Sequence, residues 1–302
     1  MTAADAFVCE APTGDQCGEA ATWVPEENAL YWTDVNRFLV HRLDAVEHTV
    51  ATWLFDEPCV ALFLTDSPGT LLLALGSRII RWEPQRDRRA DTGFRLDDWP
   101  QVRLNDGRPG PDGKIWIGSM ANNVGADGTP GEVVGSHGEL FRVASGTHGS
   151  EVLRREIGIS NTVCFSPDRR TFYFGDTPRN LIWRYDCEPE TGRIVNEQPF
   201  FEGFDRGLPD GSTVDSDGYL WNCRFGGGCI VRVAPDGSVD RVLEAPVSNI
   251  TTCEFGGADL ATLYVTTAAM MTDTFERLAG SLFSIDVGVS GIAPLRVKIE
   301  GP

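Results

Sequence analysis

One pattern recurs six times along the chain and limits the folds that the chain can adopt. Each copy has a short apolar segment, often with an aromatic residue, followed after a turn by a second apolar segment. The first segments are residues 30–34, 71–75, 115–119, 172–176, 220–222 and 263–267. The second segments are residues 38–42, 79–82, 139–142, 181–184, 229–232 and 281–284.

The segments are rich in Val, Ile, Leu and aromatic residues, which is typical of β-strands. No stretch keeps an apolar period of 3.6 residues over three turns, so long amphipathic helices are not expected. The copies recur about every 40–57 residues, which is the range for propeller blades of four strands. We therefore predict an all-β fold in which residues 1–302 form a single domain, a six-bladed β-propeller.

Gly, Asp and Pro punctuate the copies where tight turns are needed. Residues 215–218 resemble part of a calcium-binding loop, but they lack its bidentate Glu and its flanking helices, so we predict a turn. The three glycines 226–228 predict a hairpin turn within one blade. Between the third and fourth copies, the Gly-rich residues 122–136 predict a surface loop or lid. Residues 295–299 are expected to pair near residues 6–9 and so to close the ring.

The formal net charge of −18 argues against a nucleic-acid partner, which would require a basic surface. The N-terminus has neither a basic nor an apolar region of a secretory signal, and the apolar segments are too short to cross a membrane. We expect a soluble, cytoplasmic protein without a membrane partner. The eight cysteines are scattered and are expected to be reduced, buried thiols.

Four polar residues occupy equivalent places ahead of the first segment in four different copies: Glu19, Asn105, Asn161 and Asp210. Each alone would be interpreted as a turn residue or a solvated charge. The repeat geometry, however, would bring all four to one end of the central channel, where binding sites of propellers lie. Carboxylate and amide oxygens suit hard divalent cations such as Ca²⁺, Mg²⁺ or Mn²⁺. We therefore predict a metal site at the mouth of the channel.

Motifs along nearly the whole chain resemble the regucalcin/gluconolactonase family, which includes senescence marker proteins and luciferin-regenerating enzymes. The motifs are Gly18-Glu19 with Trp23, and residues 103–107 (RLNDG), 112–120 (DGKIWIGSM), 159–161 (ISN), 209–211 (PDG), 217–221 (DGYLW), 253–257 (CEFGG), 263–267 (LYVTT) and 291–294 (GIAP). The resemblance implies a six-bladed propeller, in agreement with the repeat count. It also implies the hydrolysis of a sugar lactone, such as gluconolactone or a pentonolactone, to the aldonic acid.

The resemblance implies specific roles for several residues. Glu19, Asn161 and Asp210 would hold one divalent ion, most simply Ca²⁺, although Mn²⁺, Mg²⁺, Fe²⁺ or Zn²⁺ would also suit these ligands. Arg103 and Asn105 match positions that contact the sugar lactone. Asn123 is a further candidate for substrate binding, and it stands where the family often has an acid. The sequence also departs from the family at residues 20–21, where Ala-Ala replaces the commoner Gly-Pro.

For the chemical step, the ion would act as a Lewis acid on the lactone carbonyl. Asp210 is the candidate general base, although the ion could activate the water instead. Two alternatives remain open: a calcium-binding regulatory or scaffold propeller without turnover, and a propeller esterase that acts on another ester. The chain has no HExxH zinc motif and no G-x-S-x-G nucleophile motif.

Overall fold

The computed structural model describes residues 6–146, 149–272 and 275–299. Within these residues the strands form six four-stranded antiparallel sheets, which confirms the six-bladed β-propeller. In this part of the chain the helical elements are the three-residue 3₁₀ turns η1 (Pro25–Glu27), η2 (Pro84–Arg86) and η3 (Thr177–Arg179). None of the helical elements of the described residues could cross a membrane.

The six blades follow one another along the chain. Blades 1 and 2 consist of β2 (Gly18–Val24), β3 (Ala29–Asp34), β4 (Leu39–Asp44) and β5 (Thr49–Leu54), then β6 (Cys59–Leu64), β7 (Leu71–Leu75), β8 (Arg78–Glu83) and β9 (Arg88–Arg95). Blades 3 and 4 consist of β10 (Val102–Pro109), β11 (Ile115–Ala121), β12 (Gly138–Val143) and β13 (Ser150–Ile157), then β14 (Ser160–Phe165), β15 (Thr171–Asp176), β16 (Leu181–Glu188) and β17 (Arg193–Glu202). Blades 5 and 6 consist of β18 (Leu208–Val214), β19 (Leu220–Phe225), β20 (Cys229–Val233) and β21 (Val239–Glu244), then β22 (Ile250–Gly256), β23 (Thr262–Thr267), β24 (Leu282–Asp286) and β1 (Val8–Ala11).

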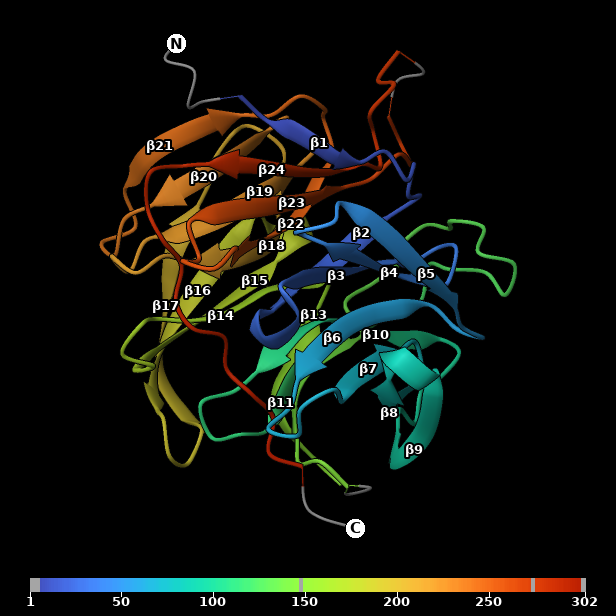
Figure 1. Cartoon of the computed structure of the whole chain (residues 1–302). Helices are drawn as coiled ribbons and strands as arrows, with labels where there is room; N and C mark the ends of the chain where they lie inside the picture. The colour runs from blue at the N-terminus through green and yellow to red at the C-terminus, as the bar shows by residue number, and fades with distance from the viewer. Residues whose placement is uncertain (1–5, 147–148, 273–274, 300–302) are drawn as a thin grey trace.

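Strands β2, β6, β10, β14, β18 and β22 line the central channel, and neighbouring inner strands contact one another around the ring (Figure 1). The two segments of each sequence repeat are therefore the second and third strands of a blade. The prediction that Glu19, Asn105, Asn161 and Asp210 precede the first strand was wrong by one strand, because each lies within the innermost strand. Polar residues and glycines interrupt the apolar pattern of these inner strands, which hid them from the pattern search.

The ring closes differently from the prediction. Strand β1 pairs antiparallel with β24, with Val8 opposite Ser284, so the N-terminus supplies the outer strand of blade 6 (Figure 1). Residues 295–299 do not pair with β1; instead, Val297 forms a parallel bridge with Thr65 of blade 2. Blade 6 has three strands from the C-terminal part of the chain. The N-terminal strand β1 pairs with the backbone N–H and C=O groups of β24 that would otherwise form an unpaired edge.

The Gly-rich residues 122–136 lie inside blade 3, between β11 and β12, rather than between two blades. The segment reaches blade 1, where the Asn36 side-chain amide donates a hydrogen bond of 2.8 Å to the Gly128 carbonyl. The turns predicted at residues 215–218 and 226–228 are confirmed, since they connect β18 to β19 and β19 to β20. All eight cysteines are free thiols, as predicted, but the prediction that they are buried was wrong for Cys9 and Cys17, which are only partly buried.

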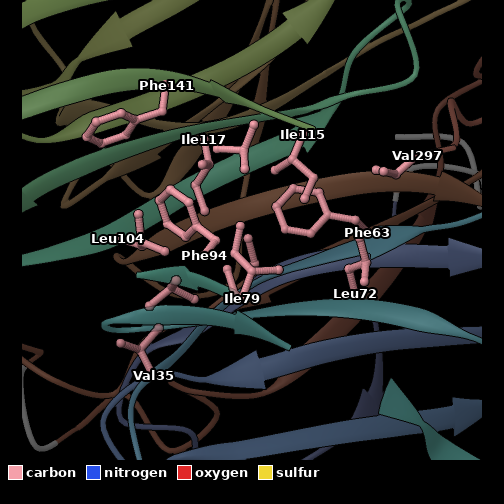
Figure 2. Close-up of a cluster of buried hydrophobic side chains, with 14 of the residues drawn as sticks. Val35, Phe63, Leu72, Ile79, Phe94, Leu104, Ile115, Ile117, Phe141 and Val297 are labelled. Atoms are coloured by element: carbon pink, nitrogen blue, oxygen red, sulfur yellow. The ribbon is translucent and has the colours of Figure 1, made fainter. Parts of the chain in front are cut away.

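Apolar side chains fill the space between neighbouring blades. Figure 2 shows one such cluster, in which Phe63 and Ile79 of blade 2 face Ile115 and Ile117 of blade 3. Four buried tryptophans also anchor turns by donating their indole N–H to an aspartate: Trp32 to Asp15, Trp82 to Asp87, Trp116 to Asp112 and Trp221 to Asp215. Each aspartate accepts a hydrogen bond from the indole N–H, which is the one polar group of a side chain that otherwise packs in the apolar core. The packed blades leave the inner strands as the rigid wall of the channel.

Candidate functional site

The inner strands share a local irregularity beside the candidate residues. The pairing register shifts between Glu19 and Thr22 in β2, between Asn161 and Cys164 in β14, and between Pro209 and Ser212 in β18. Such a β-bulge inserts residues and redirects the side chains next to it. The bulges therefore allow polar side chains to face the channel, whereas a regular strand would alternate them toward the neighbouring blade.

Two bulges contain a residue other than glycine in the left-handed region of the backbone. Ala20 has φ of 56° and Thr162 has φ of 57°. This conformation costs about 1–2 kcal/mol for a residue with a Cβ atom. Thr162 offsets part of the cost, since its hydroxyl donates a hydrogen bond of 2.7 Å to the Asp210 carbonyl. Strain held by surrounding structure is characteristic of functional sites.

Glu19 and Asp210 interact across the channel. They belong to blades 1 and 5, which are separated by blade 6, so the channel is the space through which their charges meet. Burial raises the pKa of Glu19 well above its ordinary value of 4.5, and the charges of Asp210 and Asp106 raise this pKa further. Burial also raises the pKa of Asp210 well above 3.8, again with a contribution from Asp106.

Little in the protein compensates these carboxylates. Among the described residues, neither Glu19 nor Asp210 accepts a hydrogen bond from another side chain or forms an ion pair with an Arg, Lys or His. The backbone N–H groups of Ala20 and Gly211 and the charges of Arg103 and Arg224 lower the two pKa values, but burial and the neighbouring carboxylates prevail. A divalent cation between the two carboxylates would supply the missing positive charge.

Asn161 provides a third oxygen with a defined orientation. Its side-chain N–H donates a hydrogen bond of 2.8 Å to the Thr177 hydroxyl, which in turn donates one of 2.7 Å to the Pro209 carbonyl. This chain of hydrogen bonds fixes the amide and leaves its Oδ1 atom without a donor among the described contacts. No group of three or more His, Cys, Asp and Glu residues suited to a metal occurs in the described part of the chain. The predicted ligands are of a different kind, two carboxylates and one amide.

A second group of polar side chains lies on β10 and at the end of β11. The Arg103 guanidinium donates to Asn105 Oδ1 at 2.6 Å and to Asn123 Oδ1 at 2.9 and 3.1 Å. Asn105 donates in turn to the Ser160 carbonyl at 2.8 Å, next to Asn161 in β14. The sequence predicted Arg103, Asn105 and Asn123 as substrate contacts, and the structure brings them together beside the carboxylates.

Arg103 is a buried cation in this group. Its guanidinium forms no ion pair with a carboxylate of the described residues, and its partners are amide and carbonyl oxygens. Burial lowers the pKa of Arg103 to about 10, while the charges of Cys17 and Glu19 act in the opposite direction. The guanidinium is thus held in place by amide and carbonyl oxygens of the protein.

The sequence analysis missed two residues of this region. Asp106 follows Asn105 and accepts the backbone N–H of Val163 at 3.2 Å, so it belongs to the channel and raises the pKa values of both carboxylates. Its position in Asn-Asp-Gly resembles a turn, which concealed it. Thr177 orients Asn161 from a loop of blade 4, and no pattern in the sequence indicates this role.

Residues 17–269 match the protein family described as the SMP-30/gluconolactonase/LRE-like region. The chain belongs to this family. The match covers every candidate residue and includes the inner strands of all six blades. The resemblance inferred from the motifs is thereby confirmed.

Two relatives in the SMP-30/gluconolactonase/LRE-like family are similar over nearly their full length. The 6-deoxy-6-sulfogluconolactonase of Pseudomonas putida is 33% identical, with 91% of this chain and 93% of that protein covered. The pentonolactonase XacC of Haloferax volcanii is 33% identical, with 95% and 97% covered. Among solved structures, the calcium-binding protein regucalcin of Agrobacterium tumefaciens superposes with a TM-score of 0.90 at 27% identity. The superposition covers 97% of this chain and 98% of the regucalcin chain.

Proposed function

We propose that this protein hydrolyses a sugar lactone to the aldonic acid with the help of one divalent cation. The observation that carries the proposal is a pair of carboxylates, half-buried Glu19 and buried Asp210, that have no ion-pair partner among the described residues and lie beside the Arg103–Asn105–Asn123 group. Family membership and the names of the two lactonase relatives support the same substrate class. Calcium is the first candidate ion, since the regucalcin structure is described as calcium-binding.

The proposed ligands are Glu19, Asp210 and the Oδ1 atom of Asn161. When bound, the ion would supply a Lewis acid for the lactone carbonyl. Arg103 and Asn105 would hold hydroxyl or ring oxygens of the sugar by charge-assisted and amide hydrogen bonds, which orients the carbonyl for attack. Half-buried Asn123 still has side-chain donors for a sugar oxygen, because the described contacts engage its Oδ1 atom.

We assign Asp210 as the general base. Burial and the Asp106 charge raise the pKa of Asp210 in the metal-free protein, and a bound cation would oppose this shift and keep the carboxylate ionised, which is the form that accepts a proton from water. Attack by the deprotonated water on the carbonyl carbon gives a tetrahedral centre. Breakage of the ring C–O bond then releases the acid, and Asp210 returns its proton to the leaving ring oxygen, which becomes the sugar hydroxyl. The released aldonic acid ionises in solution. Arg103 lies close enough to this group of residues to stabilise negative charge on oxygen.

The experiment removes metal from the purified protein and measures acid release from a panel of pentonolactones and hexonolactones. Each divalent ion is added back in turn, and spontaneous hydrolysis is subtracted. We expect turnover that depends on the ion and falls at least about a hundredfold in Asp210→Ala. If no lactone turns over while metal still raises the melting temperature, the lactonase proposal fails and a calcium-binding propeller without turnover is the better description.

A further inference from the structure

A cavity, called the lower cavity below, lies at the end of the channel opposite to Glu19 and Asp210. Its volume is about 270 Å³, and its wall is formed largely by the last residues of the inner strands. These include Trp23, Leu64, Pro109, Phe165 and Val214. Because the candidate site uses the first residues of the same strands, the two spaces occupy opposite faces of the propeller.

The C-terminal segment, residues 291–297, crosses the mouth of the lower cavity. Backbone hydrogen bonds hold the segment on both sides, from Gly291 to the Leu260 carbonyl at 2.8 Å and from Val297 to the Leu64 carbonyl at 2.8 Å. Between these anchors, Ile292 and Leu295 line the cavity while remaining only partly buried. Figure 1 shows the segment in red, leaving β24 toward the C-terminal end. The segment therefore leaves apolar surface that a ligand would cover.

The ion pair between Arg108 and Glu254 forms the inner wall of the lower cavity. Arg108 also donates to the carbonyls of Ala21 and Ser212, both at 3.3 Å, so its donors are engaged by three different blades. The pair carries no net charge and separates this space from the acidic residues of the candidate site. A ligand in the lower cavity would therefore contact apolar side chains around it and the neutral Arg108–Glu254 pair at its inner end.

The rim of the lower cavity carries an exposed cation. Arg169, in the loop between β14 and β15, lines the cavity, and its guanidinium forms no ion pair with any of the described carboxylates. An apolar space with one cation at its edge is complementary to a molecule with an apolar chain and one negative end. We propose that the lower cavity binds a small amphipathic carboxylate, with its chain among Trp23, Leu64 and Leu295 and its carboxylate at Arg169.

Titration calorimetry with hexanoate, octanoate and decanoate tests this proposal on the full chain. Each buried methylene should strengthen binding about fourfold until the cavity is filled. Octanol, which has the same chain without the charge, should bind up to about fivefold more weakly than octanoate. Binding that is undetectable at millimolar octanoate, or that does not change with chain length, overturns the proposal.

Three variants locate the site. Arg169→Gln should bind octanoate and octanol equally, and Arg169→Lys should restore the preference for octanoate. Ala293→Trp changes an exposed residue of the C-terminal segment over the mouth, so it should reduce octanoate binding without unfolding the protein. If Ala293→Trp binds octanoate as well as the wild type does, the lower cavity is not the site. Asp210→Asn should leave octanoate binding unchanged, which keeps this test independent of the lactonase proposal.

Discussion

Replacing Asp210 with asparagine should stabilise the metal-free protein, although most substitutions of buried residues destabilise. In the folded protein the Asp210 carboxylate is buried near the charges of Glu19 and Asp106 and forms no ion pair with a described side chain, and the charge of Arg224 offsets only part of this cost. Asparagine has nearly the same shape and removes the charge. The substitution therefore removes a repulsion and a desolvation cost that the metal-free wild type carries.

The expected size follows from the cost of a buried polar group without a partner, about 1–3 kcal/mol. The unfolding entropy is about 2.1 cal/mol/K per residue, or about 0.6 kcal/mol/K for 302 residues. The melting temperature of the metal-free protein should thus rise by about 2–5 °C. Saturating metal at about a hundred times its Kd adds about 2.7 kcal/mol to the wild type, and Asp210→Asn should lose most of this gain.

The pH dependence has a defined sign. The folded protein raises the pKa values of Glu19 and Asp210 above the ordinary values of 4.5 and 3.8. Their neutral forms therefore contribute stability that is fully present below those ordinary values and is lost as the pH rises through the raised values. Differential scanning calorimetry of the metal-free protein from pH 4 upward should show this loss, and it should be smaller in Asp210→Asn.

Asp215→Asn is the matched control, because the same substitution should have the opposite effect there. Asp215 is fully buried, accepts the Trp221 indole N–H at 2.9 Å and pairs with Arg232 at 2.7 Å. Breaking a buried pair of this kind costs about 3–5 kcal/mol. If Asp210→Asn lowers the melting temperature of the metal-free protein as Asp215→Asn does, Asp210 is compensated in solution and the argument for the ion is wrong.

Three further predictions follow from the same structure. Ala20→Gly should raise the free energy of unfolding by about 0.5–1 kcal/mol in denaturant titrations, because glycine adopts φ of 56° without strain; an unchanged midpoint would contradict the strain. Raising NaCl from about 10 mM to 1 M should raise the melting temperature, because salt screens the net charge of −18; a decrease would show that ion pairs dominate. Burial raises the pKa of Tyr264 to about 12. The stability that comes from its neutral form should therefore persist below pH 10 and disappear as the pH rises through 12. Tyr264→Phe should show a flatter dependence of stability on pH in alkaline unfolding experiments; an unchanged profile would contradict the assignment.

The site could be located from the sequence to a useful degree. Glu19, Asn105, Asn161 and Asp210 stand out because polar residues recur near the start of four repeats, and a closed ring brings these places together. The strand registers refine the prediction, since Glu19 and Asn161 precede the bulge while Asn105 and Asp210 lie one residue further along. Arg103 and Asn123 came from the family resemblance. Asp106 and Thr177 could not be found in this way, since their roles depend on contacts with β14 and with Pro209 that no local pattern encodes.

The sequence by itself determined the strand pattern, the number of blades and the polar positions, because strand-forming side chains and turn residues act locally and repeat. Only the tertiary structure decided which strand of each blade lines the channel, because the inner strands carry bulges and polar residues that break the alternating pattern. It also decided that β1 closes the ring with β24 while the C-terminal segment covers the far face. These pairings join the two ends of the chain, and their energies come from long-range hydrogen bonds and burial that appear only once the ring has formed.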